Sequence, residues 1–118
     1  MAANPLPTSS LTLVTEKTPN EVTIRCAGRI TMENTDQLRD TARNLIAENK
    51  RLVLDFSDVS YLDSSGLGMI VGLYVSAKRA KCQLKVINLS PRVKEIFTLT
   101  RLEEALSGHE EFLGATPD

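Results

Sequence analysis

The chain contains no tryptophan, only 4% aromatic residues, and a net charge of −1. Proteins that bind nucleic acid usually carry an excess of positive charge, and those that bind single strands also use aromatic side chains to stack on bases. Neither feature is present, so the sequence argues against nucleic acid as a partner. The near-neutral charge also argues against electrostatic attraction to an anionic membrane surface.

Long apolar runs are absent as well. No stretch approaches the roughly 20 apolar residues that a membrane-spanning helix requires. Residues 1–10 lack both the basic start and the apolar centre of a signal peptide. We therefore expect a cytoplasmic protein with no direct membrane insertion. Cys26 and Cys82 show no metal-ligand spacing, and we expect both to be buried thiols in a reducing compartment.

The composition is that of an ordinary globular protein, with 42% hydrophobic and 25% charged residues among 118. A chain of this length fits one compact unit. Residues 1–9 are rich in proline and hydroxyl side chains and are predicted to be a flexible tail. We expect residues 10–106 to form one domain, residues 107–118 to form a C-terminal tail, and the free protein to be a monomer.

Strands and helices alternate from residue 21 onward, which favours an α/β fold with a mixed, mainly parallel four-stranded sheet and packed helices. Strands are predicted at residues 11–15, 21–27, 52–56 and 84–89, the first two as an antiparallel hairpin with a turn at 16–20. Helices are predicted from Thr31 or Asn34 to residue 48, from the turn after residue 63 to about residue 80, and from Ser90-Pro91 onward.

Three turns follow the predicted parallel strands, at residues 28–31, 57–65 and 89–91. The carboxyl ends of parallel strands meet at one edge of a sheet, where α/β proteins bind their ligands and partners. We therefore expect all three turns to lie together at one working edge.

The stretch at residues 61–72, YLDSSGLGMIVG, is the most distinctive of these turns because it joins an apolar strand to a long apolar helix. Asp63, Ser64 and Ser65 are residue types that cap a helix by accepting its first unpaired N–H bonds. Most serines at such a position are only caps. A helix start also favours a negatively charged group, such as a phosphate, through its free N–H groups and its dipole.

Glycines crowd the start of this helix at positions 66, 68 and 72. A glycine inside a helix costs about 1 kcal/mol relative to alanine, so their number needs a reason. Gly68, Gly72 and Ser76 are spaced four residues apart and form one smooth stripe, against which another backbone can pack closely.

The sequence gives little support to catalysis. Its only histidine is His109, far from the serines, and no nucleophile elbow, Walker A lysine or dinucleotide-binding glycine pattern is present. Asp55, Asp58 and Asp63 are not spaced as a metal cage. We expect no enzyme activity, no metal and no cofactor.

Residues 52–80, LVLDFSDVSYLDSSGLGMIVGLYVSAKRA, resemble the signature segment of STAS domains. Residues 28–31 resemble that family's early strand-to-helix turn, and residues 86–93 its last core strand and following helix. The likeness spans about residues 10–106, which implies a single STAS-like domain. It is strongest to the stand-alone anti-sigma factor antagonists of bacteria.

This resemblance implies a switch. The unphosphorylated antagonist binds an anti-sigma factor with serine kinase activity and thereby releases a sigma factor for transcription. Phosphorylation of Ser64 ends the interaction, and a serine phosphatase restores it. Ser65 is the competing acceptor, but we expect it to be the structural cap. The partner-binding residues implied around Ser64 are Thr31, Asp63, Ser65, Gly66 and Leu67.

Two other roles are compatible with the same resemblance. The chain could be a STAS accessory subunit of a transporter complex, which would bind a membrane protein without obligatory phosphorylation. It could also be a module that senses a small ligand or nucleotide. A weak hydrolase ranks third, because no catalytic base accompanies the serines.

Overall fold

The computed structural model describes residues 10–99, which form one four-stranded sheet and three helices. The strands, in their order across the sheet, are β1 (Leu11–Lys17), β2 (Val22–Ile30), β3 (Arg51–Leu62) and β4 (Gln83–Ile87). The helices are α1 (Thr35–Glu48), α2 (Ser64–Arg79) and α3 (Pro91–Leu99). The predicted tails and the end of the predicted domain, from residue 100, lie outside the described residues.

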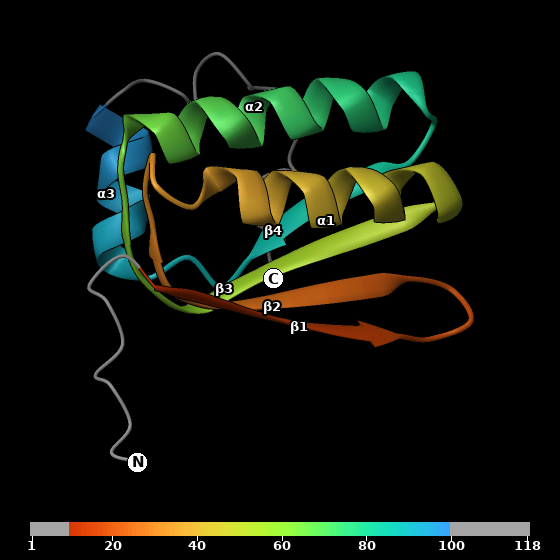
Figure 1. The fold of residues 1–118 in the computed structure, drawn as a ribbon, viewed down its shortest axis with the longest axis horizontal. Coiled ribbons are helices and arrows are strands. Elements are labelled where there is room, and N and C mark those ends of the chain that lie inside the picture. The colour runs from red at the N-terminus through yellow and green to blue at the C-terminus, as the bar shows by residue number, and fades with distance from the viewer. Residues whose placement is uncertain (1–9, 100–118) are drawn as a thin grey trace.

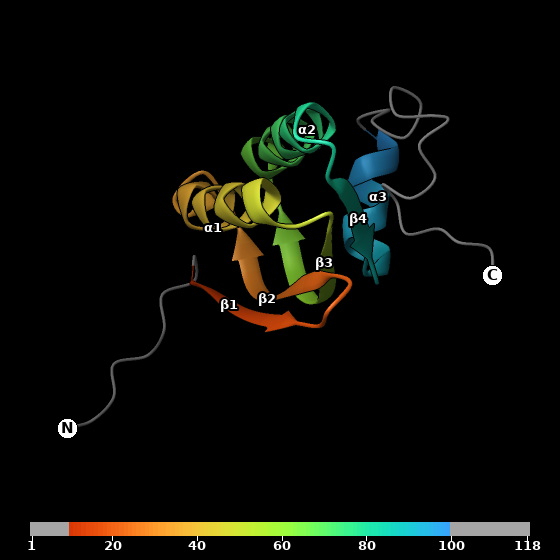
Figure 2. The same cartoon turned by 90° about the vertical axis from the view of Figure 1, so that its right-hand side faces the viewer.

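The strand directions confirm the predicted α/β fold. β1 is antiparallel to β2, whereas β2, β3 and β4 run parallel to one another. α1 and α2 lie side by side over one face of the sheet, and α3 stands apart from them and packs against β3 (Figures 1 and 2). Within residues 10–99, no helix is long and apolar enough to cross a membrane.

The core fills the space between the sheet and the helices. Leu52, Leu54 and Phe56 alternate along β3 and are fully buried, and Val53 is buried on the opposite face, as is typical of a central strand. One face of α1 is buried at Leu38, Ala42 and Ile46, whereas Leu45 is half-buried. Ser90 caps α3 as predicted, with its Oγ accepting from the Val93 N–H at 3.2 Å.

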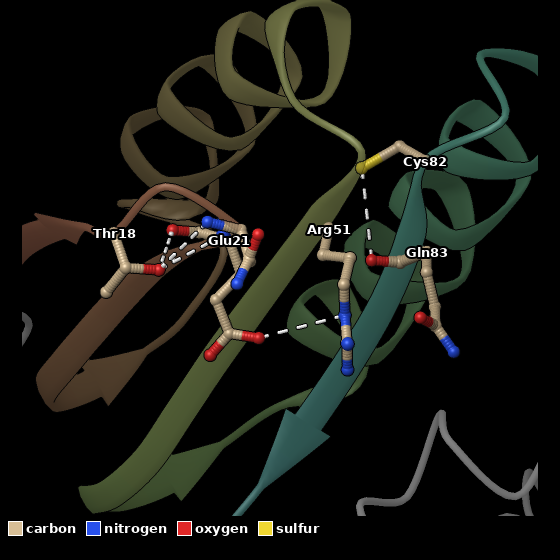
Figure 3. Close-up of polar contacts among 6 residues, drawn as sticks. Thr18, Glu21, Arg51, Cys82 and Gln83 are labelled. Carbon is tan, nitrogen blue, oxygen red and sulfur yellow. Dashed lines mark hydrogen bonds and ion pairs between the residues drawn. The ribbon is translucent and has the colours of Figure 1, made fainter.

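The β1–β2 hairpin is confirmed, but its turn is shorter than the predicted 16–20 because Glu16 and Lys17 belong to β1. Thr18 holds the turn: its Oγ1 accepts from the Glu21 N–H at 3.2 Å and donates to the Glu21 carbonyl at 3.1 Å (Figure 3). Glu21 also faces Arg51 at the start of β3, at 3.7 Å. That ion pair is exposed and contributes little stability.

The predicted turn at residues 57–65 is wrong in its first half, because β3 continues to Leu62. β2 likewise continues past its predicted end at residue 27 to Ile30, and the two strands pair along this extension through two register shifts. Asp58 and Ser60 are exposed and have turn-like side chains, but Asp58 pairs with Ala27 of β2, and Ser60 lies between the paired residues Val59 and Tyr61 at the second register shift. Tertiary pairing therefore overrode a local turn signal.

Because of this extension, the predicted single edge of three turns is also wrong. Ile87, the last residue of β4, pairs with Asp55, whereas β3 continues to Leu62. The turn after β4 therefore lies part-way along β3, where the Asn88 amide donates to Asp55 Oδ1 at 3.1 Å. Burial raises the pKa of Asp55, but the hydrogen bonds from Ser57 and Asn88 and the charge of Arg25 outweigh it and leave the pKa below its usual value.

Gly28 stands at the second register shift between β2 and β3. Its φ of +117° is rarely adopted by residues with a side chain, and a Cβ there would sit against the backbone carbonyl of Ser10. The Arg29 N–H donates to the same carbonyl at 3.2 Å. The glycine that we expected to end the strand instead allows it to continue to Ile30.

Both cysteines are free and buried, as predicted. Cys26 is 2% exposed, and its burial, together with the charge of Asp55, raises the pKa of its thiol to about 12. Burial also raises the pKa of the Cys82 thiol. Since the thiolate is the reactive form, Cys26 is inert at neutral pH.

Candidate functional site

One carboxylate joins the two turns that follow β2 and β3. Asp63 occupies the N-cap position of α2, and its Oδ1 accepts from the Gly66 N–H at 3.0 Å. Its Oδ2 accepts from the Met32 N–H, also at 3.0 Å, across the gap to the β2–α1 turn. The Asp63 N–H donates to the Ile30 carbonyl at 3.1 Å. These three bonds fix the start of α2 relative to the end of β2.

The cap is therefore Asp63 and not Ser65, which we had expected to be the structural cap. The backbone of Asp63 is extended, with φ −98° and ψ −177°, as is typical of an N-cap residue. Ser64 and Ser65 already belong to the first turn of α2, and both are exposed. The helix start therefore presents two hydroxyl groups that do not serve as its cap.

The β2–α1 turn beside these serines is held by Asn34, the only buried polar or charged residue found within residues 10–99. Asn34 Oδ1 accepts from the Thr31 N–H at 3.0 Å, and its amide donates to the Arg29 carbonyl at 2.9 Å. Asn34 stands at the N-cap of α1, yet its side chain makes no cap bond there. The turn is thus fixed internally, and it holds Met32 outward with 71% of its surface exposed.

Gly66 and Leu67, two of the predicted partner-binding residues, lie under this surface. Leu67 is only 6% exposed, and Gly66 is buried. A Cβ on Gly66 would stand 2.5 Å from Leu62 Cδ1 and 3.0 Å from Ile30 Cγ2. Gly66 is therefore required by the packing of α2 onto the ends of β2 and β3. Thr31, Asp63 and Ser65 lie at the surface around Ser64, with Thr31 and Asp63 half-buried.

The remaining glycines have a different environment. A Cβ at Gly68 or Gly72 would meet nothing within 4 Å, so no backbone in the described chain packs on the predicted smooth stripe. Gly68, Gly72 and Ser76 instead line a hollow of about 280 Å³ between the two helices, with Arg39 and Arg43 of α1 on its other side.

A second hollow, of about 540 Å³, lies between the start of α2 and α3, and Ser64 is among the residues that line it. It is lined by Tyr61, Leu62, Asp63, Ser64, Arg92, Glu95 and Ile96. Arg29 stacks on the ring of Tyr61, with its guanidinium carbon 4.4 Å from the ring centre. Figure 1 shows α3 standing at the same end of the molecule as the starts of α1 and α2.

This arrangement presents a hydroxyl group but no means to activate it. Within residues 10–99 no histidine is present to act as a base, and no group of three or more His, Cys, Asp or Glu side chains could hold a metal ion. Asp63, the nearest carboxylate, is engaged by two backbone N–H groups. The geometry suits recognition and modification by another protein better than catalysis.

Sequence reasoning missed three residues that shape this site: Met32, Asn34 and Arg92. A methionine after a strand is usually a core residue, and only the tertiary structure shows that Met32 points outward. The sequence placed Arg92 at the start of a predicted helix but did not indicate that this helix lies near Ser64. Asn34 was one of two candidate caps for α1, beside Thr31, and its side chain instead bonds to the backbone of Arg29 and Thr31 at the end of β2.

Comparison with known proteins relates this arrangement to a family. Residues 12–112 match the family model of the STAS domain. The chain is 33% identical over 87 residues to the anti-sigma-B factor antagonist of Bacillus subtilis (strain 168), and the alignment covers 74% of this chain and 80% of that protein.

Solved structures agree on the fold. The crystal structure of an anti-sigma factor antagonist from Mycobacterium paratuberculosis has a TM-score of 0.77 at 23% identity, covering 95% of this chain and 92% of that one. The phosphorylated form of SpoIIAA, a Bacillus cell fate determinant, has a TM-score of 0.65 at 21% identity, covering 86% and 88%.

We expect Asp63→Ala to lower the free energy of unfolding by about 1–2 kcal/mol, because the variant loses the helix cap and leaves the Gly66 and Met32 N–H groups without their acceptor. Ser65→Ala should change it by less than about 0.5 kcal/mol, as is usual for exposed residues. Urea denaturation measures both. If Ser65→Ala lowered the free energy of unfolding more than Asp63→Ala, Ser65 and not Asp63 would be the cap.

The glycines of α2 offer a second matched pair. Gly68→Ala should stabilise the protein by about 0.5–1 kcal/mol, because alanine is the better helix former and its methyl group meets nothing. Gly66→Ala gains the same propensity but must displace Leu62, at a cost of about 1–3 kcal/mol. Thermal unfolding should therefore move in opposite directions for the two variants. A shift of the same sign in both would contradict the packing described here.

Proposed function

The chain belongs to the STAS domain family, and on that premise we propose that it is an anti-sigma factor antagonist controlled by phosphorylation of Ser64. Unphosphorylated, it binds an anti-sigma factor with serine kinase activity, and the sigma factor is released. The family relationship supports the antagonist role, since the relative from Bacillus subtilis is named as an anti-sigma-B factor antagonist.

The observation that carries the choice of Ser64 is its position in the first turn of α2. Its hydroxyl is exposed, it is not the helix cap, and it stands next to a carboxylate that holds the neighbouring turn. A kinase can therefore reach the hydroxyl without unfolding the helix. The phosphorylated SpoIIAA structure has the same fold at 21% identity, which supports a phosphorylated state compatible with this fold.

The modification itself is a simple transfer. The partner binds ATP, the Ser64 Oγ attacks its γ-phosphorus, and the bond to the β-phosphate oxygen breaks. ADP leaves, and the hydroxyl proton passes to a base of the partner and then to water. A serine phosphatase reverses the outcome by hydrolysing the phosphate ester. The antagonist supplies only the acceptor and has no enzyme activity of its own, and the exchange takes place in the cytoplasm, where ATP is available.

The phosphate weakens binding because it lies in the interface with the partner. It adds about −1.5 to −2 charges beside Asp63, at a surface that must lose its water when the partner binds. A loss of about 3 kcal/mol in binding free energy, which is ordinary for an unpaired buried charge, weakens a complex more than a hundredfold. The fold can persist because the helix start tolerates an anion.

The partner surface that we propose combines the two turns. Ser64 and Ser65 contribute from α2, and Thr31 and Met32 contribute from the β2–α1 turn. Met32 supplies an exposed apolar side chain of the kind that anchors interfaces. Gly66 and Leu67, which are buried, contribute by holding the serines in place from below.

The modification is tested by incubating the protein with ATP and the anti-sigma factor kinase that it is proposed to bind, followed by fragment mass spectrometry. We expect phosphate on Ser64, and we expect Ser64→Asp to weaken binding of the anti-sigma factor at least about tenfold by calorimetry, as a charge mimic with less charge than phosphate. Thr15→Asp, at an exposed position of β1 outside the proposed partner surface, serves as the matched control and should leave binding unchanged. Phosphate on Ser65 alone, or Ser64→Asp binding as tightly as wild type, would overturn the assignment.

The role of Met32 is tested separately. Met32→Ser should weaken the complex with the anti-sigma factor about tenfold or more, because an apolar side chain is lost from the interface. The stability of the free protein should not fall, since the side chain is 71% exposed and packs little on the core. Val75→Ser is the control, because Val75 is also an exposed apolar residue, 45% exposed, in the C-terminal half of α2. Equal losses in both variants would argue against a specific anchor.

A further inference from the structure

We propose that Arg92, in the first turn of α3, receives the phosphate of phosphorylated Ser64 within the same chain. The inference rests on the proposed phosphorylation of Ser64 and adds the residue that holds the product. Its basis is the hollow of about 540 Å³ between the end of β3 and α3, because Ser64 and Arg92 both line it.

The hollow is built so that Arg92 stays near Ser64. α3 is anchored by the fully buried side chains of Val93 and Phe97, and its start is fixed by the Ser90 cap. Arg92 lies next to Val93 in the chain but is itself exposed, and it has no ion-pair partner among the residues that the structure describes. A long, mobile guanidinium group on a fixed helix can cross the hollow to a phosphate.

The negative charges around the hollow favour a cation that pairs with the phosphate. Asp63 and Glu95 both line it and carry negative charge, so a phosphate on Ser64 would otherwise face two carboxylates. Arg29, which is stacked on the lining residue Tyr61, does not itself line the hollow. Arg92 can donate two parallel N–H bonds to phosphate oxygens, the geometry for which arginine is best suited.

The pairing has a consequence for regulation. A phosphate that is bound to Arg92 has its charge balanced in the free protein, and a partner that covers this surface must break the pair or bury it. The phosphorylated protein is then stabilised as a free species, and a phosphatase must compete with Arg92 for the group. The strength of this pair therefore contributes to how long the antagonist stays switched off.

The test uses protein with phosphoserine incorporated at position 64 during translation, so that no kinase is needed. The second pKa of the phosphate, ordinarily about 6, is measured by phosphorus NMR as pH is varied. A nearby positive charge favours the dianion and lowers this pKa. We expect Arg92→Gln to raise it by about 0.5 or more and Arg92→Lys to restore much of the lowering.

Two further variants separate a specific pair from general electrostatics. Glu95→Gln removes a negative charge from the same hollow and should lower the pKa of the phosphate. Arg79→Gln removes a positive charge from the other end of α2, roughly 20 Å away along the helix, and should leave it unchanged. Arg92 is exposed, so Arg92→Gln should retain the fold, which the dispersion of the proton spectrum reports.

A phosphate pKa that is the same in wild type and Arg92→Gln overturns this inference and leaves the switch at Ser64 intact. Equal upward shifts for Arg92→Gln and Arg79→Gln also overturn it, because net charge alone would then explain the effect. A failure of the proposed function is detected by the separate kinase experiment, in which Ser64 would carry no phosphate after treatment with kinase and ATP.

Discussion

The site depends on the two hydrogen bonds of the Asp63 carboxylate. One oxygen starts α2 through Gly66, and the other holds the β2–α1 turn through Met32. A side chain that engages two separate backbone N–H groups makes the spacing of the two turns a fixed property of the fold. The exposed serines and the exposed methionine therefore form one surface, although they are about thirty residues apart in the sequence.

The extension of β2 and β3 beyond β4 determines what surrounds that surface. Because β4 ends opposite Asp55, the last part of β3 has a strand neighbour on one side only, and α3 packs against it. This places Arg92 and Glu95 beside Tyr61 and Ser64. The Ser64 hydroxyl thus lies near both the β2–α1 turn, where we propose that the partner binds, and the charged hollow that α3 lines.

These two sides give a physical basis for a reversible switch. In the antagonist role that we propose, phosphorylation of the exposed Ser64 hydroxyl changes its charge without a change of fold. A helix start accepts an anion, Gly66 keeps the turn closely packed below it, and the cap belongs to another residue. Modification can then act on binding while the core, formed largely by β3 and the helices, stays as it is.

The sequence by itself determined the order of the elements and the position of the site. Alternating apolar residues, the Ser90-Pro91 helix start and the DSSGLG turn are local signals, because caps and periodicity depend on neighbours in the chain. They were sufficient to predict the hairpin, the mixed sheet, the buried thiols and the serines at the start of α2.

Only the tertiary structure decided where the strands end, which residue caps α2, and what faces Ser64. Asp58 carries a turn-like side chain, yet pairing with Ala27 of β2 keeps it in the strand. The exposure of Met32 and the approach of Arg92 depend on long-range packing of α3 and of the two turns. Such contacts join distant segments, and their energies leave no mark on the local pattern of residues.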